Sequence, residues 1–324
     1  MASSVQTHTH VPPVAKVQNL IDQVPCLGLI GNTPMVRVDG WADSHPGVEI
    51  WAKVEYFNPG GSVKDRPVLR MLAEAIADGR LTRDKTIIDS SSGNAGIAYA
   101  VIGRALGYKV EIVIPDNASV ERIKRLKAHG ATVTHTSAQD GYDEAIRHVR
   151  RLVAADPDKY FYCDQYSNDG NWQAHYDSTA EEIWLQTAGE ISHFVYGVGT
   201  GGVLTGVGRK LKKLKPEVQI ELLIPEAFPG VEGLKPLRDP EDHIPEILDQ
   251  RLGDRDWDVD VDLAWEASQV LAASGLFAGQ SSGANVWTAV QVARKLAEAG
   301  EGGLIVTVLC DTGERYFSTR LWDA

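Results

Sequence analysis

Short apolar segments alternate along the chain with stretches in which apolar residues recur at helical spacing. The short segments are apolar or β-branched at nearly every position, which is typical of strands buried on both faces of a sheet. They are residues 48–55, 86–90, 109–115, 131–136, 160–163, 193–198, 218–225 and 304–310. Alternation of such strands with helices predicts an α/β fold with largely parallel sheets.

The helical stretches lie between these strands. The first one follows Lys64, places apolar residues at helical spacing from Val68 to Ile76, and should end at Gly79. The others are expected over residues 95–106, 120–129, 142–154, 179–187, 202–214, 263–274 and 284–299. Residues 225–262 are rich in Pro, Gly and Asp, and we expect a long irregular surface segment there.

Length and charge narrow the class of protein. A chain of 324 residues suggests about two domains. The net charge of -12 argues against non-specific binding to nucleic acid or to anionic membranes. The apolar runs are too short to cross a bilayer and the N-terminus does not resemble a signal peptide, so a soluble cytoplasmic protein is expected. Cys26, Cys163 and Cys310 lie far apart, which predicts neither a disulfide nor a metal site.

The segment "NPGGSVKDR", residues 58–66, places a lysine at an unusual position. Ser62 is a candidate N-cap with Asp65 as its capping-box partner, which puts Lys64 in the first helical turn. The positive end of the helix dipole and the nearby Arg66 disfavour a charged amine there. Because Schiff-base chemistry needs a neutral amine, Lys64 is a candidate nucleophile. The alternative is an exposed lysine balanced by Asp65.

Two further loops connect an apolar strand to an apolar helix. In "DSSSGNAG", residues 89–96, the backbone N–H groups at the helix start and the polar side chains of Ser91, Ser92 and Asn94 predict an anion site. The alternative is a tight turn with an N-cap. In "YGVGTGG", residues 196–202, the glycine-rich turn predicts a phosphate-binding loop.

The second loop, interpreted above as a phosphate-binding loop, also fits a dinucleotide-binding site. Gly197, Gly199 and Gly202 match the pattern G-x-G-x-x-G, and Glu221 follows at about the expected distance of roughly 20 residues. A fourth segment, "FAGQSSGANVW", places Ser281 and Ser282 before a helix, where either could be a simple N-cap.

Together, "NPGGSVKDR", "SSGNAGI", "GTGG" and "SSGA" resemble, in order and spacing, the cysteine synthase / cystathionine β-synthase family of pyridoxal-phosphate enzymes. The resemblance runs from "LIGNTPMVRV" to "CDTGERYFST" and is strongest to the cysteine synthase B branch, the O-acetylserine sulfhydrylases. It implies fold type II, as in the tryptophan synthase β chain, with two doubly wound domains and pyridoxal 5'-phosphate in the cleft between them. The smaller domain would span residues 51–168, and the larger one residues 1–50 and 169–324.

The resemblance also implies roles for individual residues. Lys64 matches the lysine that holds the cofactor covalently and later acts as the base, and Ser281 matches the serine facing the pyridine nitrogen. The cofactor site would consist of Lys64, Asn94, Gly199, Thr200, Gly201, Gly202, Val203 and Ser281. The substrate site would consist of Ser91, Ser92, Gly93, Asn94, Ala95 and Gln165. At Ala95 and Val203 the family pattern has threonine, so each position lacks a hydroxyl group.

The implied reaction is β-replacement, in which acetate leaves O-acetyl-L-serine and sulfide adds to give L-cysteine. A homodimer is expected, and a complex with serine acetyltransferase is a further alternative. Related activities stay open: O-phosphoserine sulfhydrylase, cystathionine β-synthase and diaminopropionate synthase. An NAD-dependent oxidoreductase built on Gly197–Gly202 and a catalytically silent binding protein are the alternatives from other classes.

Overall fold

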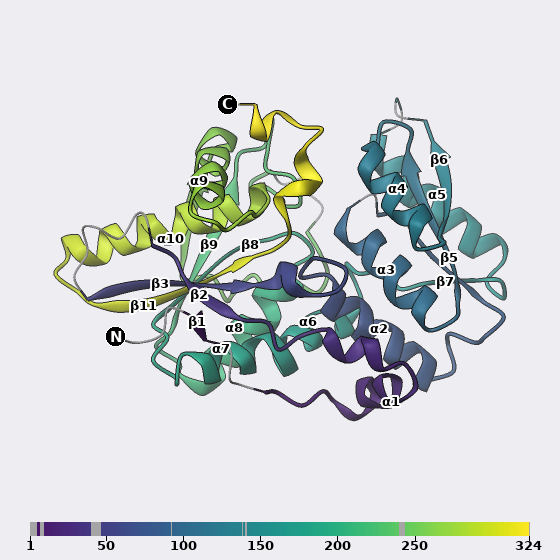
Figure 1. Ribbon diagram of the computed structural model, residues 1–324, viewed down its shortest axis with the longest axis horizontal. Coiled ribbons are helices and arrows are strands. Elements are labelled where there is room, and N and C mark those ends of the chain that lie inside the picture. Colours follow the sequence, from purple (N-terminus) through teal and green to yellow (C-terminus); the bar gives the residue numbers. More distant parts are fainter. Residues whose placement is uncertain are drawn as a thin grey trace. The chain divides into compact units, whose positions relative to one another are not determined.

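The computed structural model of the protein describes residues 5–6, 10–39, 47–91, 93–137, 139, 141–239 and 244–323 (Figure 1). The chain forms two compact units. The first unit consists of Met1–Pro12, Gly31–Phe57 and Trp172–Ala324, and the second unit consists of Pro13–Ile30 and Asn58–Asn171.

The first unit is built on a seven-stranded sheet. In spatial order its strands are β1 (Val5–Gln6), β2 (Met35–Arg37), β3 (Val48–Val54), β11 (Gly303–Leu309), β8 (His193–Gly197), β9 (Gln219–Pro225) and β10 (Arg255–Val259). The pairs from β3 to β10 are parallel, whereas β1 and β2 are antiparallel additions at one edge. The carboxyl ends of five strands therefore lie along one edge, where ligand sites form in open α/β sheets.

Helices cover both faces of this sheet. They are α6 (Asp169–Ala174), α7 (Ala180–Gln186), α8 (Gly202–Leu214), α9 (Val261–Ala273) and α10 (Gln280–Glu298), with α6 crossing the boundary between the units. Side chains of α10 pack in one apolar core with Ala52, Val195 and Ile305 of the central strands. Because side chains alternate along a strand, Lys53 points to the opposite face, where it meets Glu182 of α7.

The second unit has a four-stranded, fully parallel sheet in the order β6-β5-β4-β7. Its strands are β4 (Thr86–Asp89), β5 (Lys109–Pro115), β6 (Thr132–Thr136) and β7 (Tyr160–Tyr162). Its helices are α1 (Ala15–Gln23), α2 (Asp65–Ala77), α3 (Asn94–Ala105), α4 (Val120–Ala128) and α5 (Gly141–Ala155). The core between α1, α2, α3 and the sheet is separate from the core under α5, so this unit is doubly wound.

The predicted α/β class with mainly parallel sheets is confirmed, but several details differ. Strand β3 belongs to the first unit because it pairs with β2 and β11, although residues 51–54 were expected in the smaller domain. Residues 13–30 join the second unit because α1 packs against α2. The expected irregular stretch 225–262 contains β10, whose sequence RDWDV is polar because this strand forms an edge of the sheet.

The structure also bears on membrane spans, cysteines and metal sites. No helix among the described residues is long and apolar enough to cross a membrane. The three cysteines are free, with Cys26 exposed and Cys163 and Cys310 buried. Within the described ranges, no group of His, Cys, Asp and Glu side chains is arranged to hold a metal ion.

Candidate active site

Lys64 lies immediately before α2 in the second unit. The helix begins at Asp65 and Lys64 is its N-cap, so the prediction that Ser62 is the N-cap was wrong by two residues. The Ser62 hydroxyl accepts a hydrogen bond from the Lys64 N–H at 3.3 Å. The chain turns at Gly61, whose φ is 73°, and this turn delays the start of the helix.

The Asp65 carboxylate closes the turn before the lysine. It accepts a hydrogen bond from the Gly60 N–H at 2.5 Å, rather than from Ser62 as a capping box would require. Asp65 is fully buried and lies in the first turn of α2. A Cβ atom at Gly60 would lie 2.2 Å from an oxygen of Asp65, so this turn requires glycine at position 60.

The predicted anion loop connects β4 to α3 in the same unit. Ser91 is buried, whereas Gly93 and Asn94 are half-buried at the start of α3. A Cβ atom at Gly96 would lie 2.1 Å from the Ser91 carbonyl oxygen, so glycine permits the close approach of loop and helix. Ala95 packs in the apolar core. Ser92, also predicted for this site, lies outside the described residues.

Gln165 follows β7, the strand that pairs with β4. Because β4 and β7 are parallel, Gln165 and the loop after β4 lie at the same edge of the sheet. Gln165 is buried, and its backbone carbonyl accepts a hydrogen bond from the Asn171 side chain at 2.6 Å. Lys64, Ser91, residues 93–95 and Gln165 therefore all belong to the second unit.

Asp89, which was not among the predicted site residues, lies at the start of the segment that was predicted to bind an anion. It is the last residue of β4 and only 2% exposed. Burial raises the pKa of Asp89 to about 7, although the N–H groups of Ser90 and Ser91 donate to its carboxyl group and oppose this rise. The Tyr99 side chain of α3 lies beside it, and burial also raises the pKa of the neighbouring Cys163 thiol.

Asp89 should make stability depend on pH. The pKa in the native protein, about 7, exceeds the unfolded value of about 3.9. The native state thus binds more protons between these values, so this carboxyl group's contribution to stability falls as pH rises from about 4 to about 7. At about 1.4 kcal/mol per pKa unit, the loss is on the order of 4 kcal/mol.

Urea unfolding of the wild type and D89N at pH 5 and pH 8 measures this contribution. The wild type should lose stability relative to D89N between the two pH values, because asparagine does not titrate. An equal pH dependence in both proteins would contradict the assignment.

The predicted phosphate loop connects β8 to α8 in the first unit. Gly201 is the N-cap of this 13-residue helix, with φ of 87°. A Cβ atom at Gly199 would lie 2.5 Å from the Gly233 carbonyl oxygen. The first N–H groups of α8 have no partner within the helix and lie at its positive end, which suits a phosphate. Thr200 and Val203 are both buried beside this turn.

Ser281 lies in the first turn of α10 and is 6% exposed. Its hydroxyl has no hydrogen-bond partner among the described residues, whereas the adjacent Ser282 hydroxyl accepts a bond from the Cys310 N–H at 2.9 Å. Of these two serines, Ser281 is therefore the one whose hydroxyl can bind a ligand.

Asn285, one turn further along α10, connects Ser281's helix to the phosphate loop. It accepts a hydrogen bond from the Gly197 N–H at 3.1 Å and donates one to the Val308 carbonyl at 3.0 Å. No local pattern points to Asn285, because its partners lie 88 and 23 positions away along the chain. Asn285 holds the end of β8, β11 and α10 in a fixed arrangement.

The C-terminal segment supports the same region. The Tyr316 hydroxyl donates to Asp311 at 2.8 Å, and the Gly279 N–H donates to the Asp311 carbonyl at 3.2 Å. A Cβ atom at Gly279 would lie 2.2 Å from the Tyr316 ring. The segment therefore packs closely against the residues that precede Ser281.

Glu221 does not occupy the position that a dinucleotide site requires. It pairs with Val195 in the middle of β8, whereas the glycine loop follows the carboxyl end of that strand. Its carboxylate is 1% exposed and accepts a hydrogen bond from Trp257 Nε1 at 2.7 Å. His193 and Arg255 lie 3.8 and 3.7 Å from the other carboxylate oxygen. Glu221 is thus unavailable to a ribose, which argues against an NAD site.

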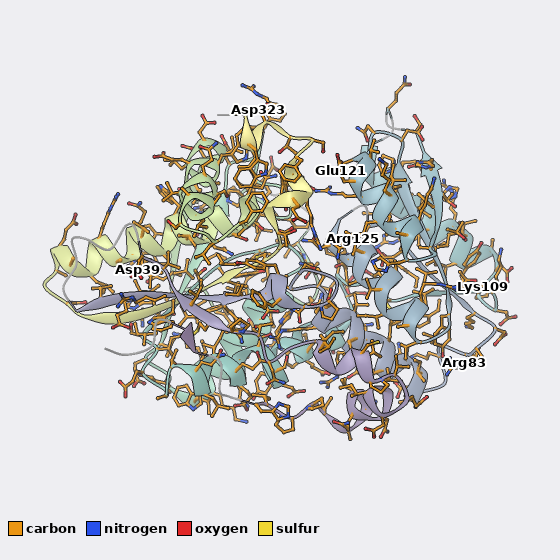
Figure 2. All side chains as sticks on the ribbon, in the orientation of Figure 1. Asp39, Arg83, Lys109, Glu121, Arg125 and Asp323 are labelled. Carbon is orange, nitrogen blue, oxygen red and sulfur yellow. The ribbon has the colours of Figure 1, made fainter. Side chains whose placement is uncertain are left out.

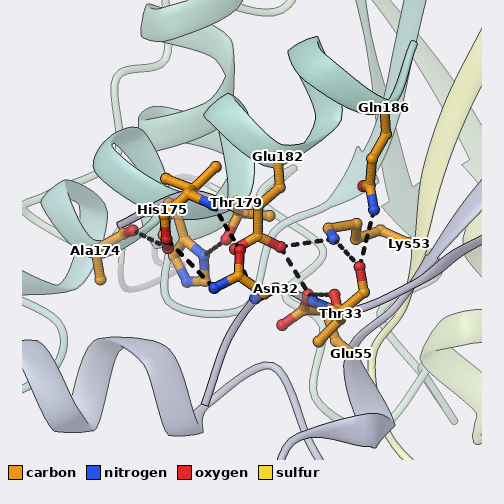
Figure 3. A network of polar contacts seen from close by, with 11 residues as sticks. Asn32, Thr33, Lys53, Glu55, Ala174, His175, Thr179, Glu182 and Gln186 are labelled. Atoms are coloured by element: carbon orange, nitrogen blue, oxygen red, sulfur yellow. Dashed lines mark hydrogen bonds and ion pairs between the residues drawn. The ribbon is translucent and has the colours of Figure 1, made fainter. Parts of the chain in front are cut away.

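A buried network holds the segment 31–34 of the first unit (Figure 3). Lys53 Nζ lies 2.6 Å from Glu182 Oε2 and donates to the Thr33 carbonyl at 2.5 Å. Glu182 also accepts hydrogen bonds from the N–H groups of Asn32 and Thr33. The Thr33 hydroxyl donates to Glu55, which directly follows β3 within the segment Gly31–Phe57 of the first unit. The network ties three sequence-distant segments of the first unit together.

Comparisons with known proteins identify relatives of this chain. A family model described as pyridoxal-phosphate dependent enzyme matches residues 27–311. A cysteine synthase from Aquifex aeolicus is 47% identical over 97% of this chain and 95% of that protein. A cysteine synthase B from Salmonella typhimurium is 38% identical over 90% of this chain and 94% of that protein.

Solved structures of two enzymes also resemble this chain in fold. A cysteine synthase from Entamoeba histolytica superposes with a TM-score of 0.87 at 36% identity, covering 92% of this chain and 90% of that one. An O-ureido-L-serine synthase superposes with a TM-score of 0.85 at 38% identity, covering 92% and 95% of the two chains.

Proposed function

Because the chain belongs to the family of pyridoxal-phosphate dependent enzymes, we propose that it is a cysteine synthase that replaces the acetoxy group of O-acetyl-L-serine by sulfide. The observation that carries this proposal is the 47% identity to a cysteine synthase over nearly the full length of both chains. The free Ser281 hydroxyl and the glycine turn at the start of α8 support it, since they fit the pyridine nitrogen and the phosphate of the cofactor.

The candidate site residues have separate roles in this reaction. We assign to the Lys64 amine the covalent attachment of the cofactor and, once the amine is released, removal of the proton from the substrate Cα. The bound cofactor supplies the electron-withdrawing ring that makes this proton acidic. Ser281 would direct its neutral hydroxyl toward the pyridine nitrogen, and Asn94 would bind the 3'-oxygen.

The phosphate would be held by Gly199, Thr200, Gly201, Gly202 and Val203. Val203 is buried and apolar, so it contributes its backbone N–H alone. In the second unit, Ser91, Ser92, Gly93, Asn94 and Ala95, together with Gln165, would bind the substrate carboxylate. Ala95 likewise contributes its backbone, because its methyl group packs in the core.

Gly199 provides a test of the phosphate loop. An alanine there would meet the Gly233 carbonyl at 2.5 Å and displace the turn, so G199A should weaken cofactor binding by about tenfold or more. Titration of the cofactor-depleted protein with pyridoxal phosphate measures this. G253A is the matched control, since its Cβ atom would make ordinary contacts at 3.6 Å. Equal affinities of G199A and the wild type would contradict the assignment.

Spectroscopy and product analysis test the function itself. The purified protein should be yellow, with an absorption band at roughly 410 nm that shifts on addition of O-acetylserine and returns on addition of sulfide. Cysteine should form in the same reaction, and borohydride should fix the cofactor to the peptide that contains Lys64. A colourless protein that binds NAD would overturn the proposal.

A second candidate differs in the leaving group or the nucleophile. The similarity to an O-ureido-L-serine synthase favours keeping this alternative, together with O-phosphoserine sulfhydrylase, cystathionine β-synthase and diaminopropionate synthase. Values of kcat/KM for O-acetylserine against O-phosphoserine, and for sulfide against homocysteine, distinguish them. We expect O-acetylserine and sulfide to be preferred.

We also propose that the protein acts in the cytoplasm as a homodimer, as the resemblance to cysteine synthases suggests. Light scattering coupled to size-exclusion chromatography tests the dimer. Co-elution with a serine acetyltransferase tests the complex that the same resemblance leaves open.

A further inference from the structure

The turn that leads to Lys64 is held from two sides at Gly60. The Gly60 N–H donates to Asp65 Oδ2 at 2.5 Å, and the Gly60 carbonyl accepts a hydrogen bond from Arg125 Nη2 at 3.0 Å. Asp65 follows Lys64 directly, whereas Arg125 comes from α4, 65 residues away along the chain. Asp65 and Arg125 therefore hold the backbone of Gly60, one through its N–H group and the other through its carbonyl group.

The turn needs such support because of its composition. Gly60 and Gly61 are adjacent, and glycine loses more conformational freedom on folding than any other residue. Within the turn, the Gly61 N–H donates to the Asn58 carbonyl at 2.7 Å and the Asn58 side chain donates to the Ser62 carbonyl at 3.2 Å. These bonds close the turn within itself.

Arg125 attaches the turn to α4, a helix that is itself anchored in the core of the second unit. Figure 2 labels Arg125 on α4. The next residue, Leu126, is fully buried in the same apolar core as α2 and α3. Arg125 itself is half-buried, and a bond from a charged guanidinium to a carbonyl is stronger than one between neutral groups. The guanidinium therefore connects the turn to α4 and, through Leu126, to the core.

We propose that Arg125 is a positioning residue, which holds the Gly60 carbonyl and so fixes the orientation in which the start of α2 presents Lys64. The inference rests on the proposed role of Lys64 in the reaction. Lys64 lies four positions after Gly60 and is followed at once by a regular helix. A turn released at Gly60 would let the Lys64 amine sample orientations that cannot reach the substrate Cα, and misplacement by about 1 Å can lower a rate by roughly two orders of magnitude.

The test compares two arginines that make the same kind of bond. Arg104 of α3 is an exposed residue, but its bond is partly buried like that of Arg125, and it also donates to a backbone carbonyl, that of Tyr108, at 2.9 Å. R125Q and R104Q thus remove equivalent bonds, one at the turn before Lys64 and one elsewhere in the second unit. R125K keeps a cation at the site without the planar guanidinium. Amide hydrogen exchange of residues 58–64 and the steady-state constants with O-acetylserine are measured for each variant.

In R125Q we expect exchange at Gly60 and Gly61 to accelerate by about tenfold or more, on the scale of a lost bond to a charged group. The kcat value should fall by about tenfold while KM changes less than about twofold, because the substrate loop is untouched. R125K should lie between R125Q and the wild type, and R104Q should match the wild type in both measurements.

Unchanged exchange in R125Q would overturn the proposal, as would an equal increase in R104Q. If R125Q does not fold, R125K decides, and exchange equal to that of the wild type would then overturn it. Failure of the proposed function would appear as absence of cysteine formation in the wild type, and it would leave the exchange comparison valid.

Discussion

Replacement of Lys64 by alanine should reduce cysteine formation by at least about 10³-fold. The variant lacks both the amine that we expect to hold the cofactor and the base that we expect to remove the substrate proton. Its stability should change less than its rate, because Lys64 is only half-buried. Initial rates with O-acetylserine and sulfide, together with the cofactor absorption band, measure the effect.

K85A is a suitable control for this change. Lys85 lies in the same unit, is half-buried like Lys64, and donates to the Pro157 carbonyl at 2.9 Å. Its removal should leave the rate and the absorption band as in the wild type. A K64A protein that kept more than about a tenth of the wild-type rate would contradict the assignment of Lys64.

Replacement of Lys53 by methionine should lower the free energy of unfolding by about 3–5 kcal/mol. Lys53 is 0% exposed and its partner Glu182 is 1% exposed, at 2.6 Å, so K53M leaves a carboxylate buried without its cation. The N–H groups of Asn32 and Thr33 would still donate to Glu182, but they carry no full charge to balance it. Urea unfolding followed by tryptophan fluorescence measures the change.

Two further variants separate burial from charge pairing. Lys16 and Asp78 form an exposed pair at 3.2 Å, with side chains 47% and 44% exposed, so K16M should cost less than about 1 kcal/mol. The double variant K53M/E182L should recover part of the stability lost in K53M, because no charge is then left without a partner. Equal losses in the free energy of unfolding in K53M and K16M would show that the buried pair contributes no more to stability than the exposed pair.

The sequence by itself determined the fold class and indicated most of the candidate site residues. Strands covered on both faces, such as β5 and β8, must be apolar at almost every position, so their periodicity is visible without tertiary information. The glycine loops before α3 and α8 are equally local, because backbone N–H groups at a helix start and the small residues that expose them are neighbours in sequence. The order of these loops and of "NPGGSVKDR" was enough to indicate the family.

The tertiary structure alone decided features that depend on partners far apart in the chain. The turn before α2 is bonded to Arg125, 65 positions from Gly60, and β10 is a strand only because β9 offers it a free edge. Lys53 and Asn285 read locally as ordinary polar residues, yet they are buried and bonded to segments more than 20 positions away. Burial and pairing of this kind arise when the chain folds, so no local pattern of residues can report them.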